Sequence, residues 1–109
     1  MTYQEINQMV ESIGLPCAYY QFTDKTAKKP PFVVWFFTDS NDAYADNSNY
    51  VKIPTLNIEL YTRFKDFENE ALVEEVLRAH GLTWYKEENY IETEKIWQIA
   101  YESEVVING

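Results

Sequence analysis

The sequence predicts an α+β domain, with a mainly antiparallel sheet of about five strands and two helices packed on one of its faces. Two segments carry apolar residues at the three-to-four spacing of an amphipathic helix. Several others alternate apolar and polar residues, as half-buried antiparallel strands do. Their order is α-β-β-β-α-β-β, which is typical of helices gathered on one side of a sheet. The 109 residues are enough to bury one core, so we expect a single domain over residues 1–109.

Both predicted helices begin and end at recognisable residues. The first spans residues 2–13, where Thr2 and Glu5 have the spacing of a capping box and a glycine follows the last apolar position. The second begins after Asp66, whose carboxylate can accept hydrogen bonds from the free amides of a first turn, and it ends at Gly81. We expect its buried face to consist of Leu72, Val73, Val76 and Leu77.

Three strands are expected between the two helices. Residues 17–22 alternate, whereas residues 32–38 form an apolar run with two valines and four aromatic residues, which suits a central strand covered on both faces. Residues 39–52 are rich in Asn and Asp, and we expect a long loop there that is either functional or mobile. Residues 53–63 alternate again, and the residues expected to face the core are Leu56, Ile58 and Leu60.

A hairpin is expected to complete the sheet. Its two strands are residues 82–87 and residues 96–106, and the polar connection between them contains residues 89–95. The last strand has apolar side chains on one face and places Glu102 and Glu104 together on the opposite face.

The charge of the chain is strongly negative and unevenly distributed. The net charge is -9, and eleven acidic against three basic residues from position 66 onward account for -8 of it. Because nucleic-acid binding draws most of its affinity from Lys and Arg, this balance disfavours specific nucleic-acid binding. The longest apolar run, residues 32–37, is far shorter than the roughly 18 residues of a membrane-spanning helix, so we expect no membrane partner.

Few residues could carry catalysis, and we predict no catalytic residue, no cofactor and no metal site. The one histidine, His80, falls in the last turn of the second helix, where a partial positive charge interacts favourably with the helix dipole. The one cysteine, Cys17, excludes an intramolecular disulfide and has no basic neighbour in sequence that would activate it. The acidic pairs lack the additional ligands of a metal site and are interpreted as solvated faces. The chain is therefore not expected to be an enzyme.

The aromatic content is unusual for so short a chain. Three Trp, nine Tyr and six Phe make up 17% of the residues, and Tyr and Trp are favoured at interfaces. Either some of these rings face a partner, or the tyrosines line the sheet with only their hydroxyls in water, and the sequence favours neither alternative. The candidates for a subunit interface are Tyr44, Tyr50, Trp35 and Tyr61.

Several stretches of the sequence resemble a known family. They are residues 56–62 (LNIELYT), 65–68 (KDFE), 90–95 (YIETEK) and 100–102 (AYE), together with residues 1–20, which contain a Gly14-Leu15-Pro16 turn and a tyrosine pair. In these stretches the chain resembles small proteins of tailed phages and prophages of Gram-positive bacteria, in the tail terminator or tail completion group of head-tail joining proteins. The likeness covers nearly the whole chain, and its motifs are structural rather than catalytic.

The resemblance implies a role in virion assembly. It implies an α+β subunit in a homo-oligomeric ring, with six subunits as the expected number, that caps the tail tube where the tail meets the head. The implied partners are further copies of the chain, the tail tube protein and the head-tail connector proteins. The implied location is the tail of the virion, and the host cytoplasm during assembly. DNA must pass such a ring without sticking, so Glu102 and Glu104 are the candidates for a channel-facing, repelling surface.

A function of another class is compatible with the same composition. An acidic protein of this size can act as a decoy that mimics DNA phosphates and binds a DNA-binding or host-defence protein. A concentration-independent monomer that binds a basic protein would favour the decoy, and a ring would favour the terminator.

Overall fold

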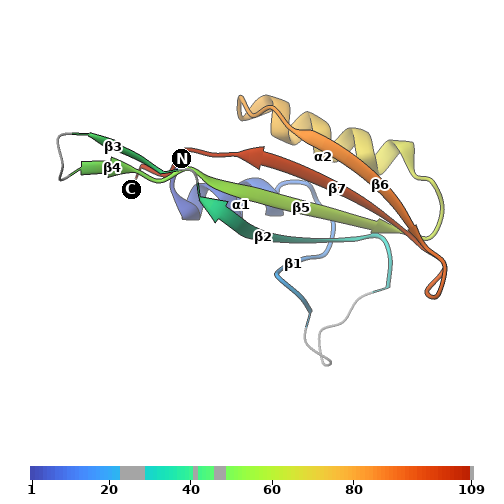
Figure 1. Ribbon diagram of the computed structural model, residues 1–109. Coiled ribbons are helices and arrows are strands. Elements are labelled where there is room, and N and C mark those ends of the chain that lie inside the picture. The colour runs from blue at the N-terminus through green and yellow to red at the C-terminus, as the bar shows by residue number, and fades with distance from the viewer. Residues whose placement is uncertain (23–28, 41, 46–48, 109) are drawn as a thin grey trace.

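The computed structural model describes residues 1–22, 29–40, 42–45 and 49–108 (Figure 1). It confirms an α+β fold with a five-stranded, mostly antiparallel sheet and two helices in the predicted order. The elements are α1 (Tyr3–Glu11), β1 (Cys17–Tyr19), β2 (Phe32–Ser40), β3 (Ala43–Ala45), β4 (Asn49–Val51), β5 (Pro54–Thr62), α2 (Phe67–Ala79), β6 (Tyr85–Ile91) and β7 (Ile96–Glu104). The strand order in the sheet is β1-β2-β5-β7-β6, and only the β1–β2 pair is parallel.

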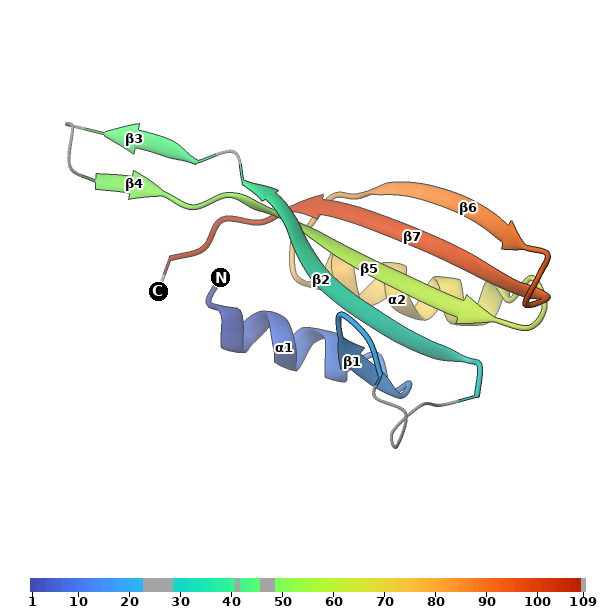
Figure 2. The same ribbon diagram turned by 60° about the horizontal axis from the view of Figure 1, so that its bottom comes forward.

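Both helices cover the same face of the sheet, and the core lies between them and the three longest strands (Figure 2). On β5, Leu56, Ile58 and Leu60 point into this core, as predicted, and each is at most 1% exposed. Ile58 pairs with Trp35 of β2 and with Tyr101 of β7, so one layer of the core runs across all three strands. We call the helix-covered face the inner face and the opposite one the open face.

The predicted helix ends are confirmed by hydrogen bonds. Thr2 Oγ1 accepts from the Glu5 amide, and Glu5 Oε1 accepts from the Thr2 amide, both at 3.1 Å, which completes the capping box of α1. Asp66 Oδ1 accepts from the Asn69 amide at 3.1 Å and caps α2. Gly81 follows α2 with φ of +73°, a left-handed conformation that glycine adopts without strain.

The buried face of α2 differs from the prediction. Val73 and Leu77 are buried as expected, but Leu72 is 46% exposed and Glu70 is only 3% exposed. The buried positions 70, 73 and 77 recur with the helical period, so the helix is turned slightly from the orientation that apolar residues alone indicate. Lysines facing Glu70, described below, account for this rotation.

The predicted strand boundaries also need correction. The first strand stops at Tyr19 rather than continuing to residue 22, because Tyr20 has φ of +69° and leaves the extended conformation. The central strand is β5, not β2, which has β1 as its outer neighbour. Strand β6 begins and ends later than predicted, since residues 85–91 pair with β7 and only residues 92–95 remain for the turn.

The prediction of a long loop over residues 39–52 is wrong for the described residues, most of which form strands. Strand β2 continues to Ser40, and β3 and β4 form an antiparallel hairpin in which Tyr44 pairs with Tyr50. Figure 1 and Figure 2 show this hairpin, which we call the arm, extending beyond one end of the five-stranded sheet. At its base, Asp42 Oδ1 accepts from the Ile53 amide at 3.1 Å. The molecule is accordingly elongated, with extents of 50 × 29 × 24 Å.

Candidate interaction surfaces

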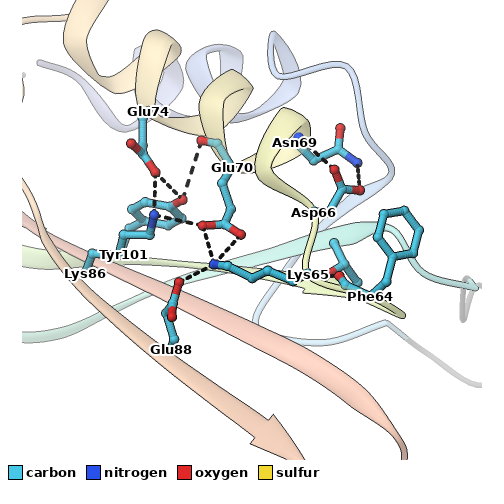
Figure 3. Close-up of polar contacts among 10 residues, drawn as sticks. Phe64, Lys65, Asp66, Asn69, Glu70, Glu74, Lys86, Glu88 and Tyr101 are labelled. Carbon is cyan, nitrogen blue, oxygen red and sulfur yellow. Dashed lines mark hydrogen bonds and ion pairs between the residues drawn. The ribbon is translucent and has the colours of Figure 1, made fainter.

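A network of ion pairs joins α2 to the edge strand β6 on the inner face (Figure 3). Glu70 is its buried centre: Lys65 Nζ lies 2.6 Å from Glu70 Oε2, and Lys86 Nζ lies 2.8 Å from Glu70 Oε1. Lys86 also contacts Glu74 at 2.9 Å, and Lys65 contacts Glu88 of β6. Because both carboxylate oxygens of Glu70 are paired with lysines, the cluster holds the helix on the sheet and offers no free acid or base.

Tyr101 extends this network into the core. Its hydroxyl donates to Glu74 Oε2 at 2.9 Å while its ring is 1% exposed. Burial, followed by the nearby Glu74 carboxylate, raises the pKa of the Tyr101 phenol well above its ordinary value. Burial alone would raise the pKa of Glu74, but hydrogen bonds from Lys86 and Tyr101 outweigh it and lower that pKa. Glu74 is therefore held as a carboxylate by its partners.

The open face has an acidic half formed by β6 and β7. Glu102 pairs in register with Asn57 on one side and Tyr85 on the other, and Glu104 follows on the same face of β7. Glu87 of β6 projects from this face as well, and all three glutamates are exposed. The structure thus brings Glu102 and Glu104 together on a helix-free surface, as the alternation predicts.

The other half of the open face is aromatic and contains a hollow of about 310 Å³. Strands β2 and β5, the segment after β1, and the β6–β7 turn all contribute to it. Its lining consists of Tyr20, Gln21, Phe22, Phe32, Val34, Glu59, Tyr61, Glu94 and Ile96. Val34 is only 6% exposed although it points away from the helices, because the chain after β1 covers part of this face.

The rings of the hollow are held in fixed relative positions. Phe32 stacks on Tyr61 with ring centroids 5.0 Å apart and an interplanar angle of 21°, and Phe22 meets Phe32 edge-on at 5.3 Å. The Tyr61 hydroxyl donates to Glu59 Oε1 at 2.9 Å and accepts from Gln98 Nε2 at 2.8 Å. Burial, and then the hydrogen bond to Glu59, raises the pKa of Tyr61 to about 12.

Two edges of the sheet have no strand beside them among the described residues. Strand β6 forms one edge along all of Tyr85–Ile91. On the other side, β1 pairs only with residues 33–35 of β2, so the rest of β2 is uncovered beyond Trp35. Unpaired backbone groups on such edges are ready to pair with another chain.

No protein-family model matches the chain, and no curated protein sequence matches it. Its fold is similar to that of one chain in a solved virion structure. A chain in the virion of a native gene transfer agent particle is similar with a TM-score of 0.59 over 95% of this chain and 90% of that chain, at 14% identity. Similarity at this identity establishes the fold.

The four candidate interface residues lie in three different places. Tyr44 and Tyr50 pair across the arm, and Tyr61 lines the hollow. Trp35 is only 7% exposed and belongs to the core, where Tyr19 packs edge-on against it at 4.9 Å. The structure therefore does not gather these four residues into one patch.

Sequence reasoning missed an exposed aromatic pair at the end of the sheet opposite the arm. Phe64 and Phe67 flank the start of α2 and are 66% and 71% exposed. Lys65 Nζ lies 5.0 Å from the centre of the Phe67 ring, which leaves the other side of that ring free. A phenylalanine at the first position of a helix is the one signal in the sequence that marks this pair as unusual.

The histidine and the cysteine considered as catalytic residues both make contacts that stabilise the fold. His80 caps the C-terminus of α2, with its Nδ1 2.8 Å from the Val76 carbonyl oxygen. Cys17 is half-buried in β1. Burial raises the pKa of its thiol, and the negative charge of Glu11 raises it further. Within the described residues, no three His, Cys, Asp or Glu side chains are grouped to hold a metal ion. In the same part of the chain no helix is long and apolar enough to cross a membrane.

Proposed function

We propose that this chain is a non-enzymatic structural protein of a phage-like virion, and specifically a tail terminator or tail completion subunit. In this role it forms a ring at the head-proximal end of the tail tube and contacts the tube protein and the connector proteins. The observation that carries the proposal is the shared fold with a chain of a gene transfer agent virion, which extends over nearly the full length of both chains. The resemblance of the sequence to phage tail proteins supports the same class independently.

The sheet edges are suited to a ring. A head-to-tail contact joins two different surfaces of neighbouring copies, and it closes when the rotation between copies divides a full turn. Strand β6 and the uncovered end of β2 lie on opposite edges of the sheet, so one copy can present one edge to the other edge of the next. The arm extends beyond the subunit's own sheet, so it can contact a neighbouring copy (Figure 2).

The acidic half of the open face is suited to a channel. Glu102 and Glu104 stand on a sheet surface with no helix over it, so they can face a central opening directly. Carboxylates there would repel the phosphate backbone and keep DNA from adhering during passage.

The test is a virion that lacks this chain. We expect a deletion in a phage or gene transfer agent that encodes it to leave heads and tubes intact but unjoined, with tails of irregular length in electron micrographs. Expression of the chain in trans should restore uniform tails, and labelled protein should map to the head-proximal tail end. Normal joined particles in the deletion strain would overturn the proposal.

The acidic half also supports a second candidate, a DNA-mimicking decoy. Glu87, Glu102 and Glu104 form an exposed row of negative charge on adjacent strands. A decoy should bind a basic DNA-binding protein tightly, lose that binding in high salt, and be absent from purified particles. A terminator should be present in purified particles in a fixed copy number per tail.

A further inference from the structure

We propose that the hollow on the aromatic half of the open face binds an arginine side chain of a partner protein. This deepens the proposed function by naming the chemistry of one contact, and it rests on that function only for the partner's place in the virion. The binding itself is a property of the isolated subunit and is tested there.

The residues that line the hollow are suited to bind a planar cation. Phe32 and Tyr61 present stacked aromatic rings, while Glu59 and Glu94 supply two carboxylates at the same hollow. An aromatic face attracts a cation through its quadrupole, and a carboxylate accepts hydrogen bonds from it. A guanidinium uses both at once because it is planar, stacks on rings and donates in the plane, whereas an ammonium is a compact point charge.

The two carboxylates have no cation of the described part of the chain to neutralise them. Glu59 accepts from the Tyr61 hydroxyl at 2.9 Å, and neither Glu59 nor Glu94 forms an ion pair with any described residue. Arg63 and Lys95 line an adjoining hollow that shares Glu94, but among the described residues neither forms an ion pair with it. This differs from the inner face, where each carboxylate of the network meets a lysine.

The size and support of the hollow fit one side chain. Its volume of about 310 Å³ is at the small end for ligand pockets, so it holds a side chain rather than a folded segment. Gln98 fixes the Tyr61 hydroxyl from β7, and Phe22 braces Phe32 edge-on, which keeps the aromatic wall in place before a partner arrives.

The experiment is an NMR titration of the isotope-labelled full chain. The probe is N-acetyl-arginine amide, and the matched probes are the corresponding lysine and norleucine derivatives. We expect saturable shifts at Phe32, Tyr61 and Ile96, with arginine binding more tightly than lysine and norleucine causing no saturable change. An arginine derivative that shifts these signals no more than norleucine does would overturn the proposal.

Charge variants separate a built site from general attraction to an acidic protein. Glu94→Gln and Glu59→Gln should each weaken arginine binding about threefold to fivefold, as loss of a solvent-accessible ion pair does. The matched control is Glu87→Gln, which removes the same charge from the same face outside the hollow and should leave the affinity unchanged. Equal effects of Glu87→Gln and Glu94→Gln would overturn the proposal.

Two further outcomes are informative. Phe32→Leu keeps the wall apolar but removes the stacked ring, so it should reduce the preference for arginine over lysine. A subunit that fails to bind arginine but still caps tails would refute this inference and leave the proposed function standing.

Discussion

Lys86 of the edge strand β6 lies 2.8 Å from the buried carboxylate of Glu70 on α2, so an ion pair fixes the helix to the edge of the sheet. Glu70 is 4% exposed at its side chain, whereas Lys86 is 32% exposed and keeps contact with water. The pair is therefore buried at one end only, and the Lys86 ammonium also lies 5.8 Å from the centre of the Tyr101 ring.

We expect removal of the Glu70 carboxylate to destabilise the fold. Glu70→Ala removes the carboxylate that Lys65 and Lys86 share, but each lysine keeps a second glutamate and contact with water, so the loss should cost about 1 to 3 kcal/mol of unfolding free energy. Urea denaturation followed by circular dichroism measures it. The control is Glu75→Ala, an exposed partner of Arg78 on the same helix, for which we expect a change below about 0.5 kcal/mol.

The network should make stability depend on acid pH. The pKa of Glu74 is lowered in the folded chain from an ordinary value of 4.5, because hydrogen bonds from Lys86 and Tyr101 outweigh its burial. A lowered folded-state pKa stabilises the fold above the unfolded pKa, and this contribution is lost as pH falls through the folded value. We expect the Tm to fall as the pH is lowered from about 5 to about 3. Glu74→Gln should show a shallower drop, and an identical slope in both proteins would contradict the assignment.

The core prediction concerns the middle of β5. Ile58 is 1% exposed and sits between Trp35 and Tyr101, so Ile58→Ala should cost about 2 to 5 kcal/mol through lost burial and a cavity. Thermal and chemical denaturation report this loss. Thr55→Ala near the start of the same strand serves as the control and should cost much less, since Thr55 is only half-buried. Equal stability of Ile58→Ala and the unmodified chain would refute the packing of this layer.

The arm should matter for assembly and not for folding. Strands β3 and β4 pair only with each other and not with the five-stranded sheet, so the double variant Tyr44→Ser and Tyr50→Ser should keep the unfolding free energy within about 0.5 kcal/mol. If the arm grips a neighbouring subunit, the variant should fail to restore uniform tails in the deletion strain. Analytical ultracentrifugation and complementation measure the two effects, and full complementation would remove the arm from the interface.

Charge reversal on the acidic half tests the channel. Both side chains are exposed on the open face, so Glu102→Lys with Glu104→Lys should leave the subunit folded. If this face lines the channel, the variant attracts DNA and slows its ejection from assembled particles. The control is Glu68→Lys with Glu75→Lys, which reverses two exposed charges on α2. Normal ejection with normal assembly would refute a channel-facing position, and failed assembly of a folded subunit would assign these residues to an interface.

Local sequence signals predict the parts of this fold that depend on local physics. Asp66 predicts the start of α2, because a helix cap is a contact between residues close in sequence. Ile58 predicts the inner face of β5, because alternation of apolar and polar residues determines which side of a strand is buried. Glu70 could not be foreseen as buried, since its partner Lys86 approaches from a strand sixteen positions later. The hollow depends in the same way on Phe22, Tyr61 and Glu94 meeting from three separate segments.

The arm is the distal end of the strands that form the middle of the sheet. Strand β2 leads into β3 and β4 leads into β5, while β2 and β5 pair in register along most of their length. Tension applied to the arm is therefore directed along β2 and β5 together, so the hydrogen bonds that carry the load in shear are those between β5 and β7, which pair from Thr55 to Thr62. A hairpin attached sideways to a sheet would open one bond at a time under the same pull. A pull on the arm is thus resisted by the sheet that forms the core of this subunit.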